Sequence, residues 1–330
     1  MFFTLAPDPH AVIAAREQAG LLRRDDFGAV EAREHYLFRA WLVEWMLDRA
    51  DRIALLPRQD HHQQFRDLFG VDVSQPEHFR VIPEGVDLQV SDEARQVIAD
   101  LETSSEWPAV IVDLERAISQ MPPTRHRLPI LLTVGRLHPI KGMDRVVAAW
   151  ARDPKLRSEY NLVVVGGNIS SPSPDEQATL AAMSTALGGM GDDGLVLLGN
   201  RSHREVSLVL AAAAAGTPAG VAPNGVYVSG SEKEEFGLAI VEALAAGLPV
   251  IAPSAGGPAT YVEHGFTGYL TDTRRVEGIR AGIRWADGTR GSEMRTNAAR
   301  RLIRSDYSLN AMASNLVSLY QSARAETTAS

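Results

Sequence analysis

The chain has 330 residues, of which 45% are hydrophobic and 22% charged, as expected for a globular protein of about two domains. Its formal net charge of −8 argues against nucleic acid or an anionic membrane as a partner. It contains no cysteine, which excludes disulfides and thiolate metal sites.

The amino-terminal stretch MFFTLAPDPH lacks the basic segment that opens a signal peptide. No apolar run approaches the ~20 residues that a membrane-spanning helix needs. We therefore expect a cytoplasmic protein without a membrane span.

The first part of the chain predicts a thin α/β unit. Its expected strands are Phe2–Leu5, Arg52–Leu56 and Phe79–Pro83, and its expected helices are Val12–Leu22, Ala29–Ala50 and Gln59–Phe69. Two polar helices, Asp92–Glu102 and Ala109–Gln120, follow before a linker. We assign residues 1–127 to one domain, and we expect it to be too small to cover both faces of its sheet.

From Leu128 onward, short apolar runs alternate with amphipathic helices. The runs are PILLTVGR, NLVVVGGN, GLVLLGN, NGVYVSG and LPVIAP, and the helices are expected at Met143–Ala151, Glu176–Leu187, Arg204–Ala215 and Leu238–Ala246. Continuous apolar strands between helices predict a parallel sheet covered on both faces. We assign residues 128–305 to this ligand-binding domain. Residues 306–330 are expected to form a helix, Ser308–Ala325, that packs back toward the first domain, and a frayed tail.

Two basic residues follow the first strand of this domain. In TVGRLHPIKGMDRV, strand Ile130–Val134 ends before Gly135 and Arg136, and Lys141 stands just before the next helix. Ligands of such sheets bind beyond the carboxyl ends of the strands, and helix N-termini favour anions. The two cations therefore predict an anion site, most simply for a diphosphate. Two solvated surface cations are the alternative.

Two glutamates occupy a stretch that is otherwise apolar, SEKEEFGLAIVEALAAGLPVIAP. Glu234 is expected on the loop before a helix and Glu242 in the second turn of that helix. The amides of Phe236, Gly237 and Leu238 are free donors at the helix start, and glycine allows a ligand to approach the backbone. Carboxylates in these places could accept hydroxyl protons of a sugar and of a ribose. Alternatively, Glu234 caps the helix and Glu242 points to solvent.

Glycine-rich turns follow several of the other strands. They contain Gly166 and Gly167, Gly199 with Asn200 and Arg201, and Gly256 and Gly257 before Pro258. Each turn by itself is also typical of an ordinary tight turn. Together they indicate one ligand-binding edge, because all of them project from the same side of a parallel sheet.

The motifs VGRLHPIKG, GGN, LLGNR, EEFGLAIVEALAAGLPVIAP, GGP and HGFTGYL occur in the order and spacing of retaining glycosyltransferase family 4. The chain resembles sucrose-phosphate synthases and related hexosyltransferases in particular. The resemblance covers residues 128–275 and reaches back to about residue 50. It implies the GT-B fold, in which two Rossmann-like domains face a cleft. Here it implies a complete C-terminal Rossmann-like domain, which binds the donor, and a partial N-terminal α/β domain on the acceptor side.

The resemblance also implies roles for the residues of the motifs. Arg136 and Lys141 would bind the diphosphate of a nucleotide sugar and stabilise the charge of the leaving nucleotide. Glu234 would hold the transferred hexose together with the amides of Phe236, Gly237 and Leu238. Glu242 would bind the ribose, and main-chain groups near Gly135, Asn200 and Arg201 would complete the donor site. The chain has no DxD triplet, so neither a metal nor another cofactor is expected.

The implied activity is retaining transfer of a hexose from a UDP-, GDP- or ADP-sugar to a sugar, sugar phosphate or similar polar acceptor. Two features depart from the family. Glu235 stands where a proline is usual, and the glycine-rich loop of the first domain is absent, which suggests a fragment or one part of a split enzyme. Asp8 and His10 lie near the place of a family histidine. The alternatives are a non-catalytic nucleotide-sugar-binding or partner-binding subunit, which could associate through the incomplete domain, and a GT-B phosphorylase or epimerase.

Overall fold

The computed structural model describes residues 2–3, 42, 45–46, 52–69, 72–74, 78–189, 191 and 193–327. The chain forms two compact units. The small unit comprises Met1–Glu84 with Asn310–Ser330, and the sheet unit comprises Gly85–Leu309. Helix Val12–Leu22, nearly all of helix Ala29–Ala50, and Asp8 and His10 lie outside the described residues.

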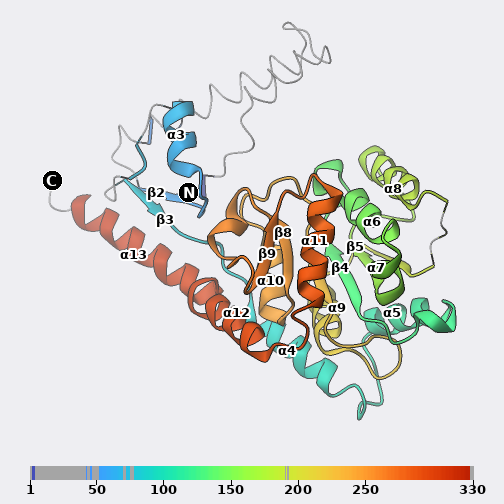
Figure 1. Ribbon diagram of the computed structural model, residues 1–330. Helices are drawn as coiled ribbons and strands as arrows, with labels where there is room; N and C mark the ends of the chain where they lie inside the picture. The colour runs from blue at the N-terminus through green and yellow to red at the C-terminus, as the bar shows by residue number, and fades with distance from the viewer. Residues whose placement is uncertain are drawn as a thin grey trace, which may run out of the picture. The chain divides into compact units, whose positions relative to one another are not determined.

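The sheet unit contains six parallel strands in the order β6-β5-β4-β7-β8-β9 (Figure 1). The strands are β4 (Ile130–Val134), β5 (Asn161–Val165), β6 (Leu195–Gly199), β7 (Val226–Val228), β8 (Val250–Pro253) and β9 (Gly268–Thr271). β5 is buried at every position, which explains why it shows no alternation of polar and apolar residues. The α/β fold with a parallel sheet predicted from the sequence is confirmed.

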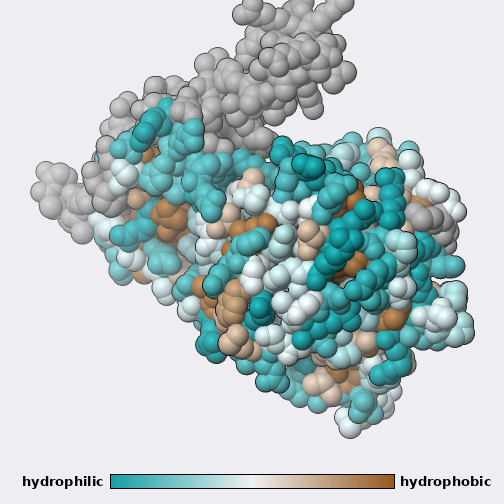
Figure 2. Space-filling view, viewed as in Figure 1, coloured by the Kyte–Doolittle hydropathy of each residue, from teal (hydrophilic) through white to brown (hydrophobic). Residues whose placement is uncertain are grey.

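Helices cover both faces of this sheet. On one face, α6 (Met143–Ala151) and α11 (Val276–Asp287) pack on the strands, and α7 (Pro154–Glu159) and α8 (Pro174–Leu187) pack against α6. On the other face lie α5 (Ala109–Ser119), α9 (His203–Ala215) and α10 (Leu238–Ala246), with α4 (Leu88–Ala99) on α9 and α10, and α12 (Glu293–Asp306) on α10. The surface seen in Figure 2 is mainly hydrophilic over this unit, with small separated hydrophobic spots.

Residues 85–127 pack with the sheet unit, whereas the sequence analysis grouped them with the N-terminal domain. The reason is the apolar side of the two helices that the sequence showed as polar. α4 buries Ala94 and Ile98, and α5 buries four side chains, Val110, Ile111, Leu114 and Ile118. The segment 262–307, which the sequence left without assigned helices or strands, supplies β9, α11 and α12.

The small unit contains a three-stranded parallel sheet in the order β1-β2-β3, formed by Phe2–Phe3, Ile53–Leu55 and Phe79–Val81. Helix α3 (His61–Phe69) contributes Phe65 to a cluster with Ile53 and Leu55. Leu319 of α13 (Leu309–Thr327) packs instead with Ala54 and Ile82. Side chains that alternate along β2 therefore reach two separate apolar clusters.

The order of the strands creates a switch point between β4 and β7. The chain runs from β4 outward through β5 to β6, then returns to place β7 on the other side of β4. In open parallel sheets, this is where the loops diverge and leave a crevice for ligands. The two helices that begin beside the crevice are α6, after β4, and α10, after β7.

Two glycines bring the loops of the crevice together. A Cβ on Gly142 would lie 2.1 Å from the carbonyl oxygen of Gly230, and a Cβ on Gly230 would lie 2.3 Å from that of Gly142. Gly142 also has a φ of +58°, a conformation that side chains with a Cβ rarely adopt. The loops after β4 and β7 thus touch through their backbones.

Replacing Gly142 should therefore destabilise the protein more than left-handed backbone strain alone does. Gly188 is a matched control, since its φ is +62° and a Cβ there would meet nothing within 4 Å. We expect Gly188→Ala to cost about 1–2 kcal/mol. Gly142→Ala should cost at least about 1 kcal/mol more, because the backbone of Gly230 must move. Urea unfolding midpoints measure both, and equal losses would contradict the close contact.

Candidate active site

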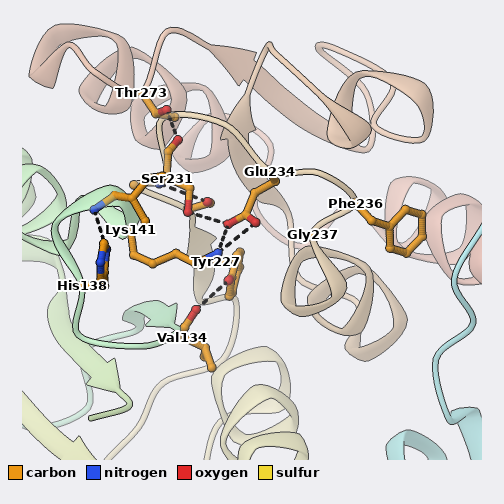
Figure 3. A network of polar contacts seen from close by, with 12 residues as sticks. Val134, His138, Lys141, Tyr227, Ser231, Glu234, Phe236, Gly237 and Thr273 are labelled. Carbon is orange, nitrogen blue, oxygen red and sulfur yellow. Dashed lines mark hydrogen bonds and ion pairs between the residues drawn. The ribbon is translucent and has the colours of Figure 1, made fainter. Parts of the chain in front are cut away.

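An ion pair crosses the switch point between β4 and β7. Lys141 ends the 3₁₀ turn Pro139–Lys141 after β4, and its Nζ lies 2.7 and 2.9 Å from the two carboxylate oxygens of Glu234 after β7 (Figure 3). The Lys141 side chain is 25% exposed and that of Glu234 is 15% exposed. The pair is thus partly shielded from solvent, which strengthens its attraction.

Buried hydroxyls orient the Glu234 carboxylate. The Ser231 hydroxyl donates to Glu234 Oε1, and the Thr273 hydroxyl donates to the carbonyl of Ser231 (Figure 3). Ser231 and Thr273 are almost completely buried. The amide of Gly257 donates to the carbonyl of Glu234 at 3.0 Å. Both the backbone and the carboxylate of Glu234 are therefore fixed before a ligand arrives.

Arg145, in the first turn of α6, ties three loops of this edge together. Its guanidinium donates to the carbonyl of Gly230 at 2.9 Å, to that of Thr273 at 3.1 Å and to the Glu232 carboxylate at 3.3 Å. Gly230 and Glu232 follow β7, while Thr273 follows β9. Arg145 therefore positions the loop that carries Glu234 relative to α6.

The start of α10 is rigid but uncapped by any side chain. Gly237 has a φ of +92° and precedes Leu238, whose side chain is 42% exposed. Phe236 points away from the ion pair and packs against Tyr261, whose hydroxyl donates to the Phe236 carbonyl at 2.6 Å (Figure 3). By contrast, the Ser202 side chain caps α9. The first amides of α10 are thus left for an external acceptor.

Tyr227 lies beneath the pair and stays neutral. Burial first, and then the negative charges of Glu234 and Glu242, raise the pKa of its hydroxyl. The hydroxyl donates to the carbonyl of Val134, the last residue of β4, at 3.3 Å (Figure 3). It therefore links β7 to β4 directly below the crevice.

Glu242 points neither freely to solvent nor into the apolar core. Its carboxylate lies 3.0 Å from Nε2 of His203, in the first turn of α9, and its side chain is 21% exposed. Burial raises the pKa of Glu242, and the interaction with His203 offsets part of this rise. Asp87 and Ser91 line the same small hollow. The pair joins the start of α9 to α10.

The two remaining arginines of the predicted site differ in their surroundings. Arg136 follows Gly135 at the same sheet edge as Glu234, is exposed, and makes no side-chain hydrogen bond or ion pair with any described residue. The Arg201 guanidinium is instead committed to the protein, since it donates to the Leu198 carbonyl and pairs with Asp113 and Glu205. Exposed Asn200 and the backbone of Arg201 therefore remain as candidate ligand contacts there.

Several residues that shape the site were not predicted from the sequence. They are Arg145, His203, Tyr227, Ser231 and Thr273. Only Ser231 could have been found, because a hydroxyl three residues before a glutamate in a loop is a common local partner. The others act on groups brought near by the fold. Among the described residues, no cluster of His, Asp and Glu could hold a metal ion, and no helix is long and apolar enough to cross a membrane.

The chain belongs to the family of glycosyl transferases group 1, whose model matches residues 115–301. A sucrose synthase of Denitrovibrio acetiphilus is 27% identical over 226 residues, which are 64% of this chain and 26% of that protein. Sucrose synthase isoform 2 of Daucus carota is 30% identical over 215 residues, covering 63% of this chain and 26% of that protein. The match thus spans about a quarter of the length of these relatives.

Solved glycosyltransferases share the fold. The sucrose-phosphate synthase of Thermosynechococcus elongatus superposes with a TM-score of 0.59 at 23% identity, over 88% of this chain and 62% of that one. A glycosyltransferase from Rickettsia africae gives a TM-score of 0.63 at 16% identity, over 96% of this chain and 80% of that one. The resemblance to GT-B glycosyltransferases expected from the motifs is confirmed.

The Lys141–Glu234 pair should contribute more to stability than a surface pair. A double-mutant cycle with Lys141→Met and Glu234→Gln should give a coupling of about 1–3 kcal/mol, because removing one partner leaves the other charge poorly solvated. The exposed pair Lys155–Glu159, at 3.9 Å, is the control and should give at most about 0.5 kcal/mol. Urea unfolding of the variants measures both. Equal couplings would show that the switch-point pair is solvated like the control.

The raised pKa of Glu242 predicts a pH-dependent stability. A carboxyl whose pKa is raised in the fold stabilises it below the unfolded pKa, near 4.5, and this contribution is lost as pH rises through the folded pKa. Glu242→Gln should therefore gain stability relative to the wild type as pH rises from about 4 to 7.

Glu205→Gln is the control of opposite sign. Hydrogen bonds from Ser202 lower the pKa of Glu205, so the wild type should instead gain stability relative to this variant as pH rises from the lowered pKa to the unfolded value near 4.5. Urea midpoints across a series extended down to about pH 3 test both trends. Parallel trends in the two variants would contradict the assigned environments.

Proposed function

We propose that this protein transfers a hexose from a nucleoside diphosphate sugar to a hydroxyl group of a sugar, a sugar phosphate or a similar polar acceptor, with retention of the anomeric configuration. The observation that carries the proposal is the pairing of Lys141 with Glu234 across the switch point. It brings a cation for phosphate and an acid for sugar hydroxyls to one crevice. The membership of the family supports the same reaction class.

The diphosphate would bind to Lys141 and Arg136. Arg136 is exposed and has no side-chain partner among the described residues, so its planar guanidinium can take two phosphate oxygens. The exposed first amides of α10 add further donors, and the positive end of the helix favours the anion. The donor would share Lys141 with Glu234 rather than find it unpaired.

Glu234 would hold the hexose. Two hydroxyls on neighbouring ring carbons can each donate to one of its oxygens, which replaces part of the hydrogen bonding that Lys141 and Ser231 now supply. The fixed backbone around Gly257 keeps this carboxylate in place during binding. Preorganisation of this kind lowers the entropy cost of positioning the sugar.

The nucleoside would lie toward β6. Glu242, held by His203, would accept the ribose hydroxyls, and the backbone near Asn200 and Arg201 would contact the base. His203 was not foreseen as part of this site. By donating to one oxygen of Glu242, it leaves the other free to accept a hydroxyl.

The reaction breaks the bond between the anomeric carbon and a diphosphate oxygen, and forms a bond from that carbon to the acceptor oxygen on the same face of the ring. The acceptor hydroxyl loses its proton, and the leaving nucleoside diphosphate gains negative charge. Arg136 and Lys141 would stabilise that charge in the transition state. We propose that these two cations take the place of a metal ion at the diphosphate.

Calorimetric titration with UDP-glucose tests donor binding. UDP-glucose is the first probe because the related fold of Anabaena HepE was solved in complex with it, and GDP- and ADP-glucose follow. Lys141→Ala and Arg136→Ala should each weaken binding about tenfold or more, since each removes a charge-assisted contact to phosphate. Arg152→Ala, an exposed arginine at the far end of α6, is the control and should bind like the wild type. Unchanged binding in both site variants would refute the donor site.

Transfer is tested separately from binding. Incubation with the bound donor and a panel of sugars and sugar phosphates, followed by NMR of the anomeric proton, should show a product with the configuration of the donor. A protein that binds a donor without transferring or hydrolysing the hexose would be a nucleotide-sugar-binding subunit. A product with inverted configuration would refute the retaining reaction.

A further inference from the structure

A cavity of the sheet unit lies at the edge opposite to the Lys141–Glu234 pair. Its walls include Gly225, Pro249 and Thr267, which directly precede β7, β8 and β9, respectively. The cavity therefore opens at the amino ends of the strands, whereas the candidate active site lies at their carboxyl ends. Its volume of about 920 Å³ is in the range of small-molecule sites.

Positive charge predominates in this cavity. Four arginines and two acids line it, namely Arg95, Arg290, Arg295 and Arg300 with Asp92 and Glu293. Asp92 already pairs with Arg95 at 3.1 Å and, through its other oxygen, with Arg304 at 2.8 Å. Arg290 pairs with Asp287 at 2.6 Å. No described carboxylate forms an ion pair with Arg295 or Arg300.

Arg300 is the most telling of these side chains. One of its terminal nitrogens donates to the carbonyl of Ala246 at 2.6 Å, but its Nε is buried and has no hydrogen-bond partner among the described residues. Burial, and next the charge of Arg95, lower the pKa of Arg300. Arg95 and Arg300 both line the cavity, so two like charges border the same space. A buried donor without a partner is costly, so this position of Arg300 opposes stability.

The ends of three helices also face this edge, and helix C-termini carry partial negative charge. Their carbonyls are already engaged. Loop amides donate to the carbonyls of Ala213, Ala214 and Ala286, and Arg300 donates to the carbonyl of Ala246. The C-terminus of α10 therefore offsets part of the charge of Arg300, and the other helix ends make no hydrogen bond with the arginines of the cavity.

From this geometry we propose that the cavity is a second ligand site, which binds a small phosphate monoester. A phosphate monoester carries about −1.5 to −2 charges at neutral pH, which matches the excess of two arginines over acids in the lining. Arg95 and Arg300 hold the phosphate through terminal nitrogens of their guanidinium groups. The small side chains of Ala211 and Ala299 leave room for the organic part. The site is independent of the donor site.

Calorimetric titration of the full chain tests the proposal, with glycerol 3-phosphate and inorganic phosphate as probes and glycerol as the neutral control. Saturating UDP fills the candidate active site, so heat from the probes then reports a second site. We expect the two anions to bind and glycerol not to bind. Failure of both anions to bind under these conditions would overturn the proposal.

Variants locate the site. Arg95→Gln and Arg300→Gln should each weaken glycerol 3-phosphate binding about tenfold or more, because each removes a charge-assisted contact. Arg204→Gln, whose side chain is 74% exposed, is the control and should bind like the wild type. Arg95→Gln keeps the contact of Arg300 with Ala246, so it remains informative if Arg300→Gln folds poorly. Unchanged binding in Arg95→Gln would refute this placement.

The variant Lys141→Ala distinguishes binding in the cavity from binding at the candidate active site. Glycerol 3-phosphate binding should survive this substitution, since Lys141 lies at the opposite edge. If Lys141→Ala abolishes probe binding while Arg95→Gln does not, the phosphate binds at the candidate active site and the cavity is not a second site.

Discussion

The candidate site depends on one contact, the ion pair between Lys141 and Glu234. The two residues are 93 positions apart in the chain, and they meet because β4 and β7 are neighbours in the sheet. The pair adds a contact between side chains to the backbone contact of Gly142 with Gly230, so the two walls of the crevice are joined at both levels. The pair therefore places one positive and one negative charge at a defined position in the crevice.

The surroundings of the pair are built to keep it there. Gly142 and Gly230 let the two loops touch through their backbones, and Arg145 joins them to the loop after β9. The Ser231 hydroxyl donates a hydrogen bond to the carboxylate. Because these contacts form without a ligand, folding already assembles the arrangement, as preorganised catalytic sites require.

Local elements were predictable from the sequence where glycine marked their ends. Strand Ile130–Val134 and helices Met143–Ala151 and Leu238–Ala246 have the predicted bounds. The sequence did not group residues 85–127 with the sheet unit, because the apolar side of α4 rests on only two buried residues, Ala94 and Ile98, within a polar sequence. Two apolar positions are too few to indicate a buried helix face, so the packing of α4 becomes evident only when α9 and α10 are seen next to it.

The residues of the candidate site were predictable as a set, but their partners were not. The motifs identified Lys141 and Glu234 as ligand-binding groups, yet nothing in the pattern indicated that they bind each other. Arg145 could not be found, because its acceptors are carbonyls 85 and 128 positions away and every residue has a carbonyl. The interaction of His203 with Glu242 depends in the same way on the packing of α9 against α10. The ligand roles of these residues remain predictions.

Helix α10 is bounded at both ends by glycines in the left-handed conformation, Gly237 and Gly247. Its nine residues span about 13 Å, from the crevice to the contact with Arg300. One residue inserted between Glu242 and Ala246 would rotate one end by about 100° relative to the other, so either the His203 contact or the Arg300 contact would be lost. Contacts at both ends therefore constrain the length of this helix. Insertions or deletions within it should be far less tolerated than substitutions on its surface.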